Sequence, residues 1–93
     1  MKPTIHMVDS ADVDVFAGIT DAIRGVSAKA REVVITAHSL LHEELSLDSL
    51  DMVAVILQVQ DQFQVEIDPD EISTMRRVAD LAASLTKQLR AAA

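Results

Sequence analysis

Apolar residues recur at helical spacing in three stretches of the chain. The first stretch places one apolar residue every three or four positions, at Phe16, Ile19, Ile23, Val26 and Ala30. Such spacing gives one apolar face of an amphipathic helix. With two further runs, it predicts long helices near 12–28, 49–64 and 76–89. Asp68-Pro69 interrupts the pattern, and a short helix is expected near 70–74. The predicted fold is all-α, a small three- to four-helix bundle.

Residues 31–48 lack this periodicity. Their apolar positions fall in two clusters, Val33, Val34 and Ile35, and then Leu40, Leu41 and Leu45. We therefore expect a long loop that is fixed to the core by apolar anchors. A loop of this length in so small a domain is usually functional.

The second helix has two apolar sides. At 100° per residue, its core face is expected to contain Met52, Val53, Val55, Ile56, Val59 and Phe63. A separate row remains at Leu50, Ala54, Leu57 and Asp61. Three apolar residues away from the core predict a contact stripe for a partner. The alternative is a central helix that its neighbours cover on two sides.

Composition narrows the classes of function. The 93 residues include no cysteine, which excludes disulfides and thiol catalysis by the chain itself. The net charge of −7 argues against nucleic acid as a partner. No apolar run reaches the length of a membrane span and no signal peptide is recognised. We expect a cytoplasmic monomer.

The charge is unevenly distributed. Between Arg31 and Arg76 there are ten Asp and Glu residues and no Lys or Arg. This one-signed segment is suited to attracting a positively charged partner surface, although simple solubility would explain it equally well.

Ser49 stands where the second helix is expected to begin, between Asp48 and Asp51. Free backbone N–H groups and the positive helix end favour a phosphate at this place. As an enzyme nucleophile the serine is poorly supported, because no G-x-S-x-G surrounds it and a catalytic triad needs a nearby base. On position alone, an ordinary N-cap serine is the simplest interpretation.

Two motifs suggest a metal only weakly. His38 and His42 are four residues apart, which is ligand spacing only in a helix, and they fall in the predicted loop. The run DPDE at 68–71 lacks the alternating ligands and central glycine of a calcium loop. No metal site is predicted.

The wider context of Ser49 resembles a known family. The run HSLLHEELSLDSLDMVAVILQVQDQFQVEI at 38–67, together with RRVADLAASL near the end of the chain, is similar to the acyl carrier proteins. The family's mark is Asp-Ser-Leu at the entrance of the second helix after an apolar and acidic loop. The resemblance covers about residues 12–89. It implies a flexible N-terminal segment at 1–11 and an acyl carrier domain at 12–93.

The resemblance implies specific roles for the residues of the site. Ser49 would carry 4′-phosphopantetheine, attached from coenzyme A by a phosphopantetheinyl transferase that Asp48 helps to engage. The thiol of that arm would hold acyl groups as thioesters, so the chain would be a carrier and not an enzyme. Partner enzymes would read a face formed by Leu50, Asp51, Ala54, Leu57 and Asp61. The acyl chain would be sheltered by Met52, Val55, Ile56, Val59 and Ile72.

The resemblance also implies the class of partner. These would be ketosynthase, acyltransferase or acyl-ligase enzymes with basic docking surfaces, in fatty-acid, polyketide or related lipid biosynthesis. Two alternatives stay open, namely a peptidyl or aryl carrier of a synthetase line, and an unmodified helical protein-interaction module. The sequence departs from the family at Ser46, where a glycine is common, and in the sparse acidic residues of the second helix. These departures suggest a specialised carrier.

Overall fold

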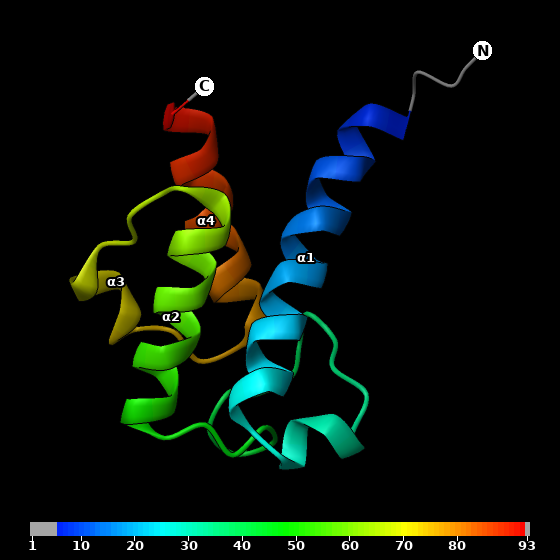
Figure 1. Ribbon diagram of the computed structural model, residues 1–93, viewed down its shortest axis with the longest axis vertical. Helices are drawn as coiled ribbons and strands as arrows, with labels where there is room; N and C mark the ends of the chain where they lie inside the picture. The colour runs from blue at the N-terminus through cyan, green and yellow to red at the C-terminus, as the bar shows by residue number, and fades with distance from the viewer. Residues whose placement is uncertain (1–5, 93) are drawn as a thin grey trace.

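The computed structural model describes residues 6–92, which fold into a helical bundle. The part of the chain that it describes contains no strand, and only a single isolated bridge pairs Leu40 with Arg77. The predicted all-α bundle is therefore confirmed (Figure 1). In chain order the elements are α1 (His6–Val26), the 3₁₀ helix η1 (Lys29–Glu32), α2 (Ser49–Phe63), α3 (Pro69–Ile72) and α4 (Val78–Ala92).

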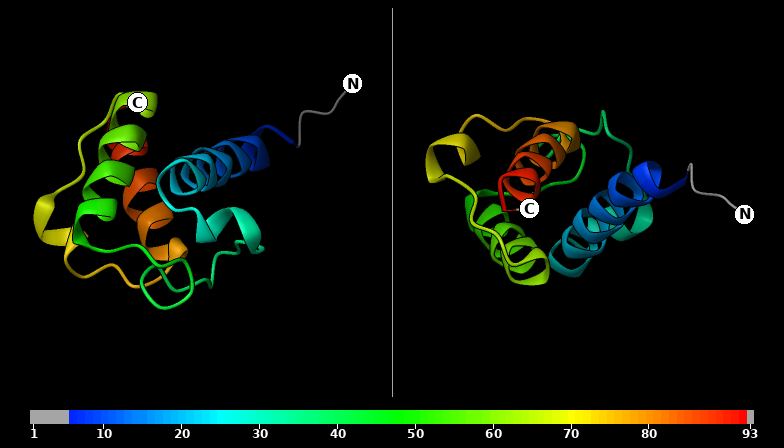
Figure 2. Two further views of the ribbon diagram at one scale, coloured as in Figure 1. Left: turned by 60° about the horizontal axis from the view of Figure 1, so that its bottom comes forward. Right: turned by 90° about the horizontal axis from the view of Figure 1, so that it is seen from above.

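The two other long helices, α2 and α4, pack against α1. Helix α1 runs in the opposite direction to α2 and α4 and contacts both of them. The short helix α3 lies on the side of the bundle remote from α1, as two views agree (Figures 1 and 2). The first residues of α2 lie at the end of the bundle where α1 ends and η1 follows. This arrangement places Ser49 at one end of the molecule, beside the long connection.

The core contains side chains from the helices and from the connection between η1 and α2. Helix α1 contributes Ile19 and Ile23, and α4 contributes Leu81 and Leu85, all four of them fully buried. The connection adds three leucines that are at most 1% exposed, Leu41, Leu45 and Leu47. The expectation of a loop fixed by apolar anchors is thus confirmed, and Leu47 is an anchor that the periodicity did not reveal.

Two details of the connection differ from expectation. The loop expected from residue 31 onward starts within a turn of 3₁₀ helix, η1, instead of irregular chain. Val34 was expected to be an anchor but is 83% exposed, whereas its neighbour Ile35 is buried. Consecutive residues of an extended segment point in opposite directions, so the two cannot both face the core.

Helix boundaries also differ from expectation at two ends. Helix α1 begins at His6 and not near residue 12. Residues 6–11 are therefore helical, while 1–5 lie outside the described residues, so the flexibility of 1–11 stays a prediction. Helix α4 begins at Val78, where the Asp80 carboxylate accepts hydrogen bonds from the backbone N–H groups of Arg76 and Arg77 at 2.9 and 3.0 Å. Those bonds occupy N–H groups that have no partner within the helix.

Within the described residues, no helix is both long enough and apolar enough to cross a membrane.

Candidate functional site

Two carboxylates fix the start of α2. The Asp48 side chain accepts a hydrogen bond from the Asp51 N–H at 2.8 Å, and the Asp51 side chain accepts one from the Asp48 N–H at 3.2 Å. This reciprocal pair is a capping box, with Asp48 at the N-cap. Ser49 is thus the first residue of the helix, and its interpretation as an N-cap serine is wrong.

The hydroxyl of Ser49 is accessible. The residue is exposed, and no described residue forms a hydrogen bond with its side chain. The backbone N–H groups of Ser49 and Leu50 also form no hydrogen bond with a described residue. At this end of the helix, the N–H groups of Asp51 and Met52 are the ones that donate, the first to the Asp48 carboxylate and the second to the Asp48 carbonyl. Two unpaired N–H groups at the positive end of a 15-residue helix favour a phosphate ester on this oxygen. The site therefore fits a phosphate-linked group without Lys or Arg.

The chain before Ser49 is held in place by several hydrogen bonds. The buried Ser27 hydroxyl, just after α1, donates to the Leu45 carbonyl at 2.8 Å. The imidazole Nδ1 of His42 hydrogen-bonds to the carbonyl of Leu47. Between these anchors Ser46 adopts a left-handed conformation with φ of 57°. This conformation favours glycine, and the sequence already singled out Ser46 as a departure from the family.

Of the two histidines considered as metal ligands, His42 forms a hydrogen bond through its ring, whereas His38 forms hydrogen bonds with described residues through its backbone. The ring of His42 bonds to Leu47, and the carbonyl of His38 accepts a hydrogen bond from Arg77 Nη1 at 2.6 Å. The latter bond joins the connection to the start of α4. Among the described residues, no group of three or more His, Cys, Asp or Glu side chains gathers as a metal site would require.

An exposed apolar stripe runs along α2 from the site. Leu50 is 80% exposed and Leu57 is 58% exposed, while Ala54 is half-buried and Asp61 exposed. The row recognised in the sequence therefore faces outward, and neighbouring helices do not cover it. Val53 belongs to the same surface with 53% exposure, so its assignment to the core face is wrong. At 100° per residue, Val53 lies about 60° from Leu50 around the helix, and this angle could have revealed its true side.

The opposite side of α2 forms part of the core. Met52, Val55, Ile56 and Val59 are buried there. Phe63 is half-buried and packs against the core cluster, as does Ile72 of α3. The structure thus brings the five residues expected to shelter an acyl chain to one apolar region. A space for a chain among them stays a prediction.

The comparison with protein families decides the assignment. The profile of the family described as "Phosphopantetheine attachment site" matches residues 17–85, most of the chain. The chain belongs to this family of phosphopantetheine-dependent carrier domains. Its Asp-Ser-Leu motif at 48–50 lies inside the matched region.

Individual relatives agree with this assignment. The chain is 33% identical over 75 residues to an acyl carrier protein from Thermobifida fusca, with 81% of this chain and 90% of the relative covered. It is 29% identical over 84 residues to the chloroplast acyl carrier protein 1 of Spinacia oleracea, with 87% of this chain covered. The chain spans only 60% of the length of that spinach protein.

A solved structure shares the fold. The crystal structure of an acyl carrier protein from Thermotoga maritima superposes with a TM-score of 0.75 at 26% sequence identity. The match covers 88% of this chain and 94% of the other. The expected membership of the acyl carrier family is thus confirmed, and with it 4′-phosphopantetheine as the cofactor of the domain.

Proposed function

We propose that Ser49 is the attachment point of 4′-phosphopantetheine and that the chain carries acyl intermediates to the enzymes of a fatty-acid, polyketide or related lipid pathway. The observation that supports this most strongly is the exposed hydroxyl of Ser49, on the first residue of α2, which forms no hydrogen bond with any described residue. The bound group would supply the thiol that this cysteine-free chain lacks. The side chains around Ser49 present the group and take no part in bond making.

Asp48 has two proposed roles that a substitution can separate. Its carboxylate caps α2 through the Asp51 N–H. It also stands next to Ser49 as an exposed negative charge, suited to engage a phosphopantetheinyl transferase and its magnesium ion. Asp48→Asn keeps a capping oxygen and removes the charge, because asparagine caps helices about as well as aspartate. We expect this variant to fold normally and to be modified more slowly.

The exposed stripe is the proposed partner surface. Leu50, Ala54 and Leu57 offer apolar contact, and Asp51 and Asp61 add negative charge for a basic docking surface. An open hollow of about 680 Å³ continues from Leu57 and Asp61 towards α4. A ketosynthase, acyltransferase or acyl ligase that contacts the stripe could thus extend a side chain between α2 and α4.

The decisive test is mass spectrometry after incubation with coenzyme A, magnesium and a phosphopantetheinyl transferase. The wild-type chain should gain one phosphopantetheine, and Ser49→Ala should gain none. Ser46→Ala is the matched control, because Ser46 is also an exposed serine of the same segment. Since Asp48 provides the cap, we expect Ser49→Ala to change stability by less than about 0.5 kcal/mol.

Two outcomes would contradict the proposal. A mass gain that persists in Ser49→Ala would place the attachment elsewhere. A wild-type chain that gains no mass under conditions that modify a known carrier would support the unmodified interaction module instead.

A further inference from the structure

Helix α3 has little apolar packing of its own. None of its four residues, Pro69–Ile72, is buried. Pro69 and Asp70 are exposed, and only Ile72 packs partly against the core cluster. A short element with so few buried contacts is expected to open locally at low cost unless another interaction holds it.

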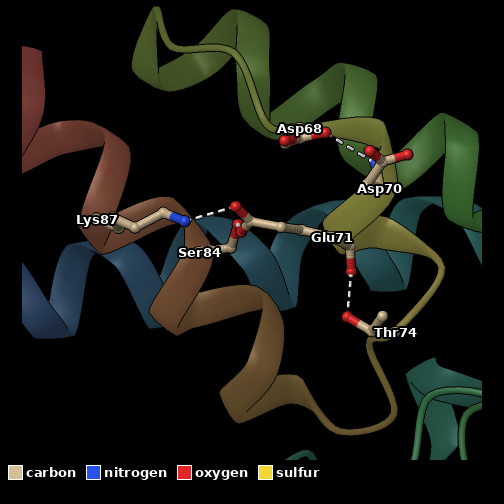
Figure 3. A network of polar contacts seen from close by, with 6 residues as sticks. All are labelled: Asp68, Asp70, Glu71, Thr74, Ser84 and Lys87. Carbon is tan, nitrogen blue, oxygen red and sulfur yellow. Dashed lines mark hydrogen bonds and ion pairs between the residues drawn. The ribbon is translucent and has the colours of Figure 1, made fainter.

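Glu71 supplies that interaction. Its Oε1 accepts a hydrogen bond from the Ser84 hydroxyl at 2.6 Å, and its Oε2 accepts one from Lys87 Nζ at 2.5 Å (Figure 3). Ser84 and Lys87 are three residues apart and therefore share one face of α4. Among the described residues, Glu71 makes every side-chain hydrogen bond between α3 and another helix.

The other polar contacts around α3 shape the helix and do not attach it. Asp68 caps it by accepting from the Asp70 N–H at 2.9 Å, and the Thr74 hydroxyl donates to the Glu71 carbonyl at 2.8 Å. These bonds join residues of the same segment, as Figure 3 shows. These internal bonds therefore do not hold α3 against α4, and a four-residue helix released from α4 is expected to lose them readily.

We infer that Glu71 is a positioning residue that holds α3 against α4 and so keeps Ile72 over the apolar core. Ile72 follows Glu71 directly, so a displacement of one moves the other. If the chain carries acyl groups, as the proposed function on which this inference rests requires, Glu71 limits the entry of an acyl chain beneath α3. An incoming chain would have to separate Glu71 from Ser84 and Lys87.

Solvent exposure of Glu71 and Lys87 lowers the cost of separating α3 from α4. Lys87 is 58% exposed and Glu71 is 32% exposed, so solvent screens their attraction. Asp80 is the other charged residue that lines the hollow beside them. The hydrogen bonds from Lys87 and Ser84 lower the pKa of Glu71, so the contact is made by a carboxylate at neutral pH. The contact therefore joins α3 to α4 through groups that solvent can reach, which favours local separation of the two helices.

Amide hydrogen exchange on the unmodified chain tests whether Glu71 holds α3. Glu71→Gln and Lys87→Met should each raise the exchange of the Ile72 and Met75 amides about three- to tenfold, with the amides of α1 unchanged. Asp70→Asn is the matched control, because it removes the same charge from the neighbouring residue, whose side chain makes no described hydrogen bond. The charge reversal Glu71→Lys with Lys87→Glu should restore slow exchange.

Two results would overturn this part of the inference. One is exchange in Glu71→Gln within twofold of the wild type. The other is equal acceleration in Asp70→Asn, which would show a general effect of charge on α3. The reversal separates pairing from a local structural role of Glu71, since only pairing is rescued by exchanging the two charges.

A second measurement tests the consequence for cargo. The chain is loaded with an octanoyl-phosphopantetheine arm, and thioester cleavage by hydroxylamine is followed. If Glu71 limits entry, Glu71→Gln should shelter the chain more often and slow cleavage about two- to fivefold relative to Asp70→Asn. Equal rates would overturn the role in cargo entry. Failure to load the chain would contradict the proposed function, while the exchange result would still decide how α3 is held.

Discussion

Gly18 of α1 faces the ring of Phe63 of α2 so closely that a β-carbon at Gly18 would lie 2.7 Å from the ring carbons Cε2 and Cζ. The side-chain nitrogen Nε2 of Gln62 would lie 3.0 Å from the same β-carbon. The sequence marks Gly18 only as a weak helix former, yet its missing side chain lets α1 and the end of α2 approach. A glycine within a helix often has such a packing reason.

This contact predicts an interaction between positions 18 and 63. Gly18→Ala should destabilise the wild-type chain by about 1 kcal/mol, because the gain in helix propensity is smaller than the cost of displacing the ring. In a Phe63→Ala background the same change should stabilise by about 0.5–1 kcal/mol. Urea unfolding of the four proteins of this double-mutant cycle measures the coupling. Equal effects of Gly18→Ala in both backgrounds would show that the ring does not limit position 18.

Ser46 provides a second prediction about the backbone. Its φ of 57° is costly for a residue with a β-carbon, and its side chain makes no hydrogen bond with any described residue. Ser46→Gly should therefore stabilise the chain by about 0.5–1 kcal/mol, even though glycine makes the unfolded state more flexible. Ser46→Ala is the control that keeps the β-carbon, and it should not stabilise. A gain of stability in Ser46→Ala equal to that in Ser46→Gly would contradict a backbone origin.

The features that the sequence predicted correctly depend on near neighbours in the chain. Helical spacing indicates α2, the outward row at Leu50 and Leu57, and the apolar side that begins at Met52, because each is set by the 3.6-residue repeat. The start of α2 at Ser49 is also set locally, because the capping box joins Asp48 and Asp51, three residues apart. These properties need no knowledge of tertiary packing.

Two of the features that were missed depend on partners far away in the chain. Glu71 meets Ser84 and Lys87 across 13 and 16 residues, and no periodicity relates them. The left-handed Ser46 arises because the connection must turn between the buried Leu45 and Leu47. Val53 is apolar like its neighbours, so hydrophobicity alone did not reveal that it faces solvent. Tertiary contacts decide the first two of these features, whereas the angle of Val53 from Leu50 around the helix already indicated its outward side.

Asp80 should make the free energy of unfolding depend on pH in the acid range. The hydrogen bonds from the N–H groups of Arg76 and Arg77 lower the pKa of Asp80 below its usual value of 3.8. A carboxyl group whose pKa is lower in the folded chain stabilises the fold above its unfolded pKa. That contribution is lost as pH falls through the folded pKa, so the loss should occur below about pH 4.

Urea unfolding between pH 2.5 and 7 measures this linkage. Asp80→Asn should be less stable than the wild type at pH 7 and should show a shallower decline of stability in acid. Asp14→Asn is a suitable control, because Asp14 is an exposed carboxylate of α1. A wild-type and an Asp80→Asn curve that run parallel throughout would contradict a role of this carboxylate.

The exposed stripe of α2 predicts how partners are recognised. With few carboxylates on this helix, docking should depend more on the apolar contact of Leu57 than on the charge of Asp61. A leucine that fills a pocket of a partner can contribute about 2 kcal/mol or more, whereas a charge at the rim mainly affects association rate and salt dependence. Leu57→Asp should therefore weaken binding to a cognate ketosynthase or acyltransferase more than Asp61→Asn does.

Calorimetry of the two variants at two salt concentrations tests this ranking. Binding of the wild type should fall only modestly with salt, because screening acts on exposed charges beyond a Debye length of about 8–10 Å. Val53→Asp extends the test to the residue that the structure adds to the stripe, and we expect it to weaken binding as well. If Asp61→Asn abolishes binding while Leu57→Asp is tolerated, the apolar stripe is not the docking surface, and the negative charge of α2 is what partners recognise.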